Sequence, residues 1–284
     1  MMKILFMAST LRKPNPSWHL MKALMEDVLD AGIAIHAIQR CPENAQLPAF
    51  PDSILRHKTF SYSEVQSKTV EKKRFAKRYL NAVKESFRFC RHLKEHNDYD
   101  MLFLQSSFTS FFTLCIARHY AKKRPVIFNS QDMFPGSAIA NGSMPQKWMQ
   151  IIFYRMQKIA YKRASYITAI SEDMKIKLLE QGVPKEKIGV IVNWFDSVVK
   201  EVKWEDNRFV QKYDLRKEKF YVQYAGTMGT NFNPQIILDV AERLKNENSI
   251  EFQMVGEGIR KEKFQKDAEE RNLHNIAFYP LQSQ

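Results

Sequence analysis

The feature that most constrains the fold of this chain is a repeated alternation of short apolar runs with longer segments of helical periodicity. Near-continuous apolar strands separated by helices predict a parallel sheet that is covered by helices on both faces. Right-handed crossovers then make this a doubly wound, Rossmann-like α/β domain. The apolar runs are at 3–8, 33–38, 101–105, 126–129, 166–170 and 189–193, and the helix-like stretches are at 17–31, about 66–96, 109–122, 144–163 and 171–181.

The alternation stops for about twenty residues and then resumes. Residues 197–218 are charged and have no clear period, which indicates a connection between domains. We therefore expect an N-terminal Rossmann-like domain at 1–196 and a second one at 219–284. The second domain has three candidate strands, whereas domains of this class usually have five or six, so it is predicted to be incomplete. Its strands are expected at 220–225, 250–256 and 275–279, and its helices at 234–246 and 259–271.

One helix can be predicted in detail. Ser171 is placed to cap its N-terminus, and Glu172 and Asp173 favour the positive end of the helix dipole. Gly182 is a suitable left-handed stop. The residues expected to face the core are Met174, Leu178 and Leu179.

Composition limits the compartment and the partners. The chain has 284 residues and a formal charge of +13, so it attracts anionic partners such as nucleic acid, acidic lipids or nucleotides. Its three cysteines have no metal-like spacing, which favours a reducing compartment. No apolar run approaches the ~20 residues of a membrane span. We expect a cytoplasmic protein, with peripheral contact to the inner face of the cell membrane left open.

A glycine turn between a strand and a helix suggests a phosphate site. The segment "YAGTMGTNFNP" at 224–234 follows an apolar strand and precedes the amphipathic "QIILDVAERLKN". Gly226 and Gly229 let the backbone approach a diphosphate, and the helix N-terminus favours its charge. The alternative is a plain tight turn.

Several ordered segments resemble one known family. "ITAISEDMKIKLLEQGVPKEKIGVIVNWFD", "YVQYAGTMGTNFNPQIILDVAERLK" and "IEFQMVGEGIRKEKFQKDAEERNLHNIAFYP" are similar, in this order, to GT-B glycosyltransferases of the large retaining family 4. "FNSQDMFPGS" resembles a loop of bacterial capsule and O-antigen aminosugar transferases. The resemblance implies transfer from a nucleotide-sugar donor, expected to be UDP-linked, to a polyprenyl-phosphate-linked or glycan acceptor in surface polysaccharide biosynthesis.

The resemblance also implies where the donor binds. The donor is expected between the two domains, on two glycine turns of the second domain. The turn at 256–258 is expected near the base or ribose of the nucleotide. The residues expected to bind the donor are Gly226, Thr227, Met228, Gly229, Gly256, Glu257 and Gly258.

The sequence departs from the family pattern in three places. The first strand is followed by "STLRKPNPSWH", without a Gly-Gly loop, and "GTMGTNFNP" contains no cation for the diphosphate. The family's Glu–seven residues–Glu pair is expected further downstream, so Glu172/Glu180 and Glu262/Glu270 are interpreted as chance spacings. These departures predict a transferase that is truncated at its C-terminus.

The acceptor and the catalytic groups are expected at the carboxyl ends of strands in the first domain. Gln131 and Asp132 follow the strand at 126–129; Asp132 can orient an acceptor hydroxyl or take its proton, and Gln131 can hydrogen-bond a hydroxyl or phosphate. Asp132 is equally well explained as a loop brace. Ser9, Thr10 and Pro135 are the expected acceptor-binding residues.

The most basic segment, 68–94, contains ten Lys or Arg residues and two Glu residues. The apolar stripe predicted to pack on the sheet is Phe75, Tyr79, Val83, Phe87 and Cys90. Its basic side is either a solvated face or a surface for anionic lipid, formed by Lys72, Lys73, Lys77 and Arg78. Helix 144–163, with Trp148 and Phe153, is a candidate for the same surface.

Other chemistries have weaker support. The seven histidines show no ligand spacing, His36 is expected to be a core histidine, and we predict no metal and no cofactor. The alternatives that stay open are an inactive nucleotide-sugar-binding fragment, a basic nucleic-acid-binding protein and a nucleotide-sugar epimerase. No recognition helix, RNP-type strand or zinc knuckle supports specific nucleic-acid binding.

Overall fold

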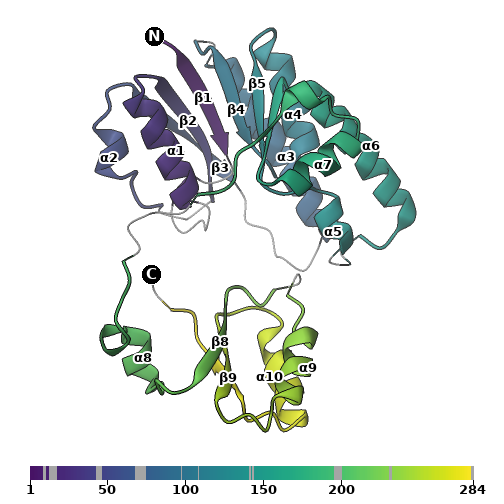
Figure 1. Cartoon of the computed structure of the whole chain (residues 1–284). Helices are drawn as coiled ribbons and strands as arrows, with labels where there is room; N and C mark the ends of the chain where they lie inside the picture. The colour runs from purple at the N-terminus through teal and green to yellow at the C-terminus, as the bar shows by residue number, and fades with distance from the viewer. Residues whose placement is uncertain are drawn as a thin grey trace. The chain divides into compact units, whose positions relative to one another are not determined.

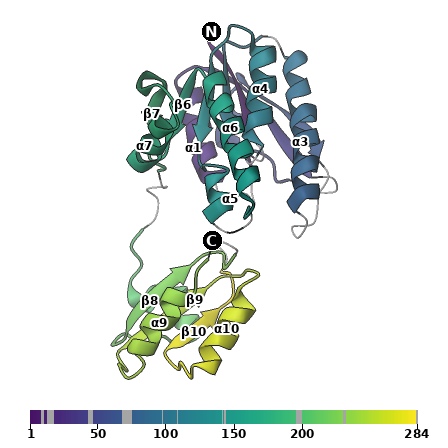
Figure 2. The same cartoon turned by 90° about the vertical axis from the view of Figure 1, so that its right-hand side faces the viewer.

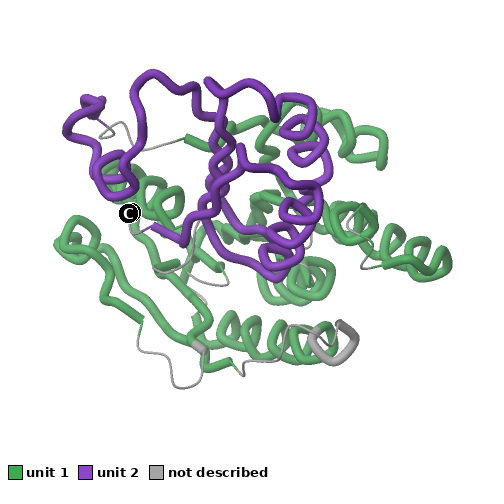
Figure 3. The backbone as a smooth tube through the Cα atoms, turned by 90° about the horizontal axis from the view of Figure 1, so that it is seen from below, with its two compact units in different colours: residues 1–196 green, residues 197–284 purple. Residues whose placement is uncertain are grey.

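The chain divides into two compact units, residues 1–196 and 197–284 (Figure 3). The structure is a computed structural model, and the side chains of residues 42 and 75–78 lie outside its description. The residues that it describes are 1–8, 11–12, 18–42, 47–67, 75–96, 98–107, 109–140, 142, 144–194, 200–229 and 232–282.

Unit 1 is built on a seven-stranded sheet in the order β3-β2-β1-β4-β5-β6-β7 (Figure 1). Every neighbouring pair is parallel. The strand order reverses direction after β1, which is the topology of a doubly wound fold. The strands are β1 Lys3–Ala8, β2 Ala34–Pro42, β3 Phe60–Ser67, β4 Met101–Gln105, β5 Val126–Ser130, β6 Tyr166–Ala169 and β7 Ile188–Val190.

Helices cover both faces of this sheet (Figures 1 and 2). On one face lie α1 (Trp18–Asp30) and the short α2 (Asp52–Leu55). Helices α3, α4, α6 and α7 lie on the other face, as right-handed crossovers require. Their bounds are α3 Phe75–Arg91, α4 Ser110–Ala121, α6 Lys147–Arg163 and α7 Glu172–Glu180; the short α5 is Gly136–Ala140.

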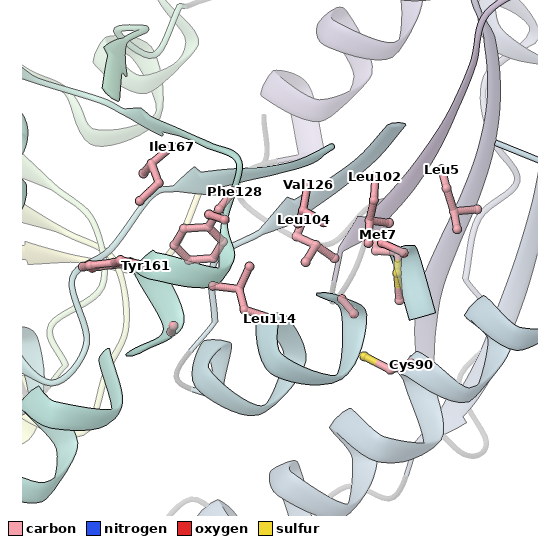
Figure 4. Close-up of a cluster of buried hydrophobic side chains, with 14 of the residues drawn as sticks. Leu5, Met7, Cys90, Leu102, Leu104, Leu114, Val126, Phe128, Tyr161 and Ile167 are labelled. Carbon is pink, nitrogen blue, oxygen red and sulfur yellow. The ribbon is translucent and has the colours of Figure 1, made fainter. Parts of the chain in front are cut away.

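Two buried clusters hold the sheet between these layers. Phe6 and Met25 belong to the cluster under α1. Leu5 and Met7, on the opposite face of the same strand, belong to the cluster under α3 and α4 (Figure 4). This alternation along β1 explains why its sequence is apolar at every position from Ile4 to Ala8, as strands buried on both faces require.

Unit 2 contains a three-stranded parallel sheet in the order β10-β9-β8, with α9 and α10 as its long helices. Phe252, Met254 and Phe264 form the centre of its buried cluster. The elements are α8 Arg208–Tyr213, β8 Phe220–Ala225, α9 Gln235–Arg243, β9 Ile250–Val255, α10 Lys261–Glu270 and β10 Ile276–Tyr279. The prediction of an α/β fold with two parallel, Rossmann-like units is confirmed.

The detailed prediction for helix 171–181 holds at its ends. The Ser171 hydroxyl accepts a hydrogen bond from the Met174 amide at 3.1 Å, and Gly182 has a φ of +80°. Leu178 is fully buried, but Leu179 is 36% exposed, so its predicted place in the core is wrong. Met174 takes the adjacent, partly buried position against the core.

Two further features differ from the sequence-based expectation. The sequence pattern did not predict β3, which pairs with β2 over its whole length. On α3, Cys90 is buried as expected, but Phe87 is 55% exposed. Ser86 faces inward instead, and its hydroxyl lies 2.9 Å from the Thr109 hydroxyl.

Candidate active site

The segment after β5 carries the first group of candidate residues. The Gln131 amide donates to the Ser106 hydroxyl at 2.9 Å, which joins the ends of β5 and β4. Its side chain donates to Asn129 at 3.2 Å and accepts from Asn193 at 2.9 Å. The oxygen and the nitrogen of the Gln131 side-chain amide are therefore both hydrogen-bonded within the protein. In this arrangement the residue stabilises the carboxyl ends of the central strands β4 and β5.

Asp132 differs from its neighbour because it is exposed. One carboxylate oxygen accepts a hydrogen bond from the Ser137 hydroxyl at 3.1 Å, and the other has no partner among the described residues. A carboxylate held on one side and open on the other can accept a proton or a hydroxyl hydrogen bond. Pro135, three residues on, is buried and follows a cis peptide bond.

A cleft of about 740 Å³ opens beside Asp132, within the usual size range of small-molecule sites. Gln131, Asp132 and Ser137 line it from the segment after β5, and Ser171, Asp173 and Lys177 line it from α7. The sequence predicts the last three residues only as parts of a helix. Their position could have been found from topology, because α7 begins at the carboxyl end of β6, the neighbour of β5.

On its other side, Asp132 borders a small cavity of about 30 Å³ with aromatic walls. The rings of Tyr79 and Phe153 lie 5.1 Å apart, and those of Phe134 and Phe153 lie 5.3 Å apart. Burial raises the pKa of Tyr79 to about 12, and burial likewise raises the pKa of Tyr161 to about 12. Both phenols therefore stay protonated near neutral pH, and Asp132 is the carboxylate that borders this cavity.

In unit 2, the two predicted glycine turns are interlocked. The Gly226 amide donates to Val255 and the Met228 amide donates to Glu257, both at 3.0 Å. A Cβ atom on Gly256 would lie 2.0 Å from the Gly226 carbonyl oxygen, and one on Gly258 would lie 2.3 Å from that of Met228. Gly256 and Gly258 are thus required by the contact between the turns, whether or not a ligand binds.

The first turn presents different groups to solvent. Met228 is fully buried in the core of unit 2, and its backbone amide and carbonyl bond to Glu257 and Arg260. Thr227 is exposed, and a Cβ on Gly229 would meet no atom closer than 3.5 Å. Gly229 therefore has no steric need to be glycine within the chain, which fits a position that a ligand approaches.

The fold also brings cations to these turns that the sequence analysis missed. The Arg260 guanidinium donates to the Phe232 carbonyl at 2.6 Å, and its amide donates to the Met228 carbonyl at 3.0 Å. Lys261 pairs with Glu257 at 2.7 Å. The segment "GTMGTNFNP" has no cation of its own, but the residues just after the second turn supply two beside it.

The other predicted site residues are not placed by the structure. Ser9, Thr10, Lys72 and Lys73 lie outside the described residues. Lys77 and Arg78 belong to α3, but their side chains are outside the description. Their acceptor-binding and membrane roles stay predictions. His36 is a buried histidine, as expected, with its ring nitrogens 2.7 and 3.0 Å from the Ser61 and Ser63 hydroxyls.

Comparison with protein families identifies the class. Residues 20–198 match the model of Glycosyltransferase Family 4, and the chain belongs to this family. The match covers unit 1 from α1 to β7, including Gln131, Asp132 and the cleft beside them. The predicted family is confirmed.

Among curated proteins, the chain is similar to WcaI of Escherichia coli K12, described as a colanic acid biosynthesis glycosyl transferase. The two are 32% identical over 119 residues, which is 41% of this chain and 29% of WcaI. The matched stretch thus spans less than a third of the length of that relative.

Solved structures share the fold at low identity. HepE of Anabaena, in complex with UDP-glucose, aligns with a TM-score of 0.63 and 14% identity, over 100% of this chain and 70% of HepE. UDP-GlcNAc 2-epimerase of Neisseria meningitidis, bound to UDP-GlcNAc, aligns with a TM-score of 0.57 and 14% identity, over 100% of this chain and 73% of the epimerase. These likenesses establish the GT-B class of fold.

Proposed function

We propose that this protein transfers a sugar from a nucleotide-activated donor, expected to be a UDP sugar, to a lipid-linked or glycan acceptor of bacterial surface polysaccharide. The observation that carries the proposal is the match to Glycosyltransferase Family 4 over residues 20–198. The similarity to WcaI supports a role in capsule-like polysaccharide, and the expected site of action is the cytoplasm. The UDP-glucose complex of HepE, a protein of the same fold, supports a UDP-linked donor.

The donor diphosphate would bind at the interlocked turns of unit 2. Thr227 and Gly229 offer an exposed backbone path at the end of β8, where α/β sheets bind ligands. Arg260 and Lys261 lie next to these turns and would offset the charge that builds up on the leaving diphosphate. Such electrostatic stabilisation is usually the largest contribution to catalysis of this kind.

The acceptor would bind in the cleft beside Asp132. The Ser137 hydroxyl fixes one oxygen of the carboxylate, and the open oxygen would accept the proton of the acceptor hydroxyl as it attacks the sugar. Gln131 would act indirectly, because its side chain holds Asn129 and Asn193 in position. The hydroxyl and charged groups of Ser171, Asp173 and Lys177 would orient the hydroxyls of a sugar in the cleft.

A transfer assay with UDP sugars radiolabelled in the sugar, and polyprenyl-diphosphate-linked sugars as acceptors, tests this proposal. We expect Asp132→Asn to lower the transfer rate about 10²- to 10⁴-fold, because it removes the proton acceptor. Asp52→Asn, which neutralises an exposed carboxylate on α2, serves as the charge-matched control and should transfer at the wild-type rate. Equal rates for Asp132→Asn and wild type would contradict the role of Asp132.

The same assay separates the alternatives. Labelled donor bound but never transferred, for all acceptors, would favour the inactive nucleotide-sugar-binding alternative. An epimerase, which shares this fold, would instead convert the UDP sugar without any acceptor. The proposed transferase requires both donor and acceptor for turnover.

A further inference from the structure

Helix α6 presents an apolar stripe to solvent. Trp148, Ile151, Ile152 and Ile159 are 64%, 54%, 46% and 45% exposed. Their spacing of three, four and seven residues places them on one face of the helix. The opposite face packs on unit 1 through the buried Gln157, Ala160 and Tyr161. This outward stripe has no covering element among the described residues of unit 1, and Figure 2 shows α6 on the outer side of the helical layer.

The charge around this stripe has a single sign. Between residues 144 and 163 there are five Lys or Arg residues and no Asp or Glu. Arg155 and Lys162 fall within the exposed stripe by helical spacing, and Lys158 borders it. None of the five forms an ion pair with a described carboxylate. The five residues are Lys147, Arg155, Lys158, Lys162 and Arg163.

We propose that the outward face of α6 docks the protein on the surface of an anionic lipid bilayer. Exposed isoleucines and a tryptophan beside unpaired cations are the composition of helices that lie in the membrane interface. Charge complementarity selects this occupant, because negatively charged lipid head groups complement the five cations of the helix and the net charge of +13 of the chain. Among the described residues, none of the helices has the length and hydropathy of a membrane span.

Helix α6 also lies beside the small cavity at Asp132. Phe153 and Met156, on the flank of the same helix, line the small cavity at Asp132. A bilayer at the outward face would therefore bring a lipid-linked acceptor to within one helix width of Asp132. The docking itself does not depend on sugar transfer and can be tested without it.

The test is flotation of the purified chain with vesicles of phosphatidylglycerol and phosphatidylcholine, and with vesicles of phosphatidylcholine alone. We expect binding to the anionic vesicles that weakens with added salt, and little binding to the neutral ones. The double variant Ile151→Glu/Ile152→Glu should bind the anionic vesicles at least about tenfold more weakly, because it places negative charge in the exposed stripe that would enter the bilayer surface.

The matched control is Ile176→Glu on α7, which is 51% exposed in the wild type and lies on a helix with three acidic residues. It should bind like the wild type. Trp148 provides a second readout: vesicle binding should shift its fluorescence to the blue, and Trp148→Phe should remove that shift. Failure of the wild-type chain to bind anionic vesicles, or equal binding by the double variant, would overturn the proposal. So would a dimer in solution that is lost in the double variant without any vesicle binding.

Discussion

At the scale of single residues, the glycines of unit 2 have two different reasons to be glycine. Gly226, Gly229, Gly256 and Gly258 are all predicted to bind the donor, from their places in two glycine turns and from the family resemblance. The contacts divide them: those at 256 and 258 are needed by the first turn, whereas a Cβ atom at 229 would make only an ordinary contact with Thr227. A sequence alone cannot make this distinction, because it depends on which backbone lies against the turn.

This difference predicts losses of stability of very different size for two equivalent substitutions. Gly256→Ala should lower the free energy of unfolding of unit 2 by about 3 kcal/mol or more, since the new methyl group collides with the Gly226 carbonyl. Gly229→Ala should cost less than about 1 kcal/mol, because it meets only ordinary contacts. Hydrogen exchange of the β8 and β9 amides, followed in both variants, measures this. Equal losses of protection in the two variants would contradict the interlocked turns.

His36 predicts a dependence of stability on pH. Burial, with the nearby positive charge of His96 and Lys3, lowers the pKa of His36 to about 4, although Asp98 opposes the shift. The unfolded chain takes up this proton near pH 6.5 and the folded chain only near pH 4, so folding loses stability as the pH falls between those values. The slope from this residue is at most about 1.4 kcal/mol per pH unit.

Denaturant unfolding of the wild type and His36→Gln at several pH values between 7 and 4 tests this, with the range set by the two pKa values above. Gln keeps a hydrogen-bonding group near the Ser61 and Ser63 hydroxyls but does not titrate. Its stability should fall less steeply on acidification. Parallel curves for the two proteins would show that His36 is not responsible.

At the scale of elements, the sequence predicted the strongly apolar strands and missed the mixed one. β3 reads "FSYSEVQS", in which only Val65 is fully buried, because it is the edge strand of the sheet. An edge strand needs fewer apolar residues than a central strand, so its pattern is weak. The rotation of α3 about its axis was also predicted wrongly, because a polar residue lies on its buried face. Ser86 faces the core, where its hydroxyl bonds to the Thr109 hydroxyl, while Phe87 points outward.

The observed rotation of α3 can be tested with two phenylalanines two positions apart. Phe89 is 3% exposed, so Phe89→Ala should lower the free energy of unfolding by about 3–5 kcal/mol. Phe87 is 55% exposed, so Phe87→Ala should cost about 1 kcal/mol or less, mainly through its contact with Phe112. Thermal or denaturant unfolding of both variants provides the comparison. A larger loss for Phe87→Ala would favour the stripe predicted from the sequence.

At the scale of the whole molecule, the alternation of strands and helices was sufficient to predict two parallel α/β units. The turns at the carboxyl ends of β5, β8 and β9 were also found, because strand ends in this class of fold are marked by polar and glycine residues. What the pattern could not supply was contact between distant segments. The interlocked glycine turns, Arg260 beside Phe232, and α7 beside Asp132 all depend on such contacts.

The location of the candidate membrane surface also depends on how charged and apolar residues are distributed over the whole molecule. The sequence predicts a membrane surface mainly on 68–94, because this is the most basic segment. The structure adds a second requirement, exposed apolar residues beside the cations, which α6 meets through Trp148, Ile151, Ile152 and Ile159. Net charge alone attracts any anion, whereas the combination favours an interface that is charged and apolar.

The most direct test of the central claim is calorimetric titration of this chain with UDP and with UDP sugars, using GDP as the comparison nucleotide. The account predicts saturable binding of UDP. It also predicts that Arg260→Gln weakens this binding about 10- to 150-fold, because a charge-assisted contact to phosphate contributes about 1.5–3 kcal/mol. Arg271→Gln, at an arginine that pairs with Asp239 and Glu242 on the surface, is the control and should bind like the wild type. A folded chain that binds neither UDP nor any UDP sugar would contradict the claim.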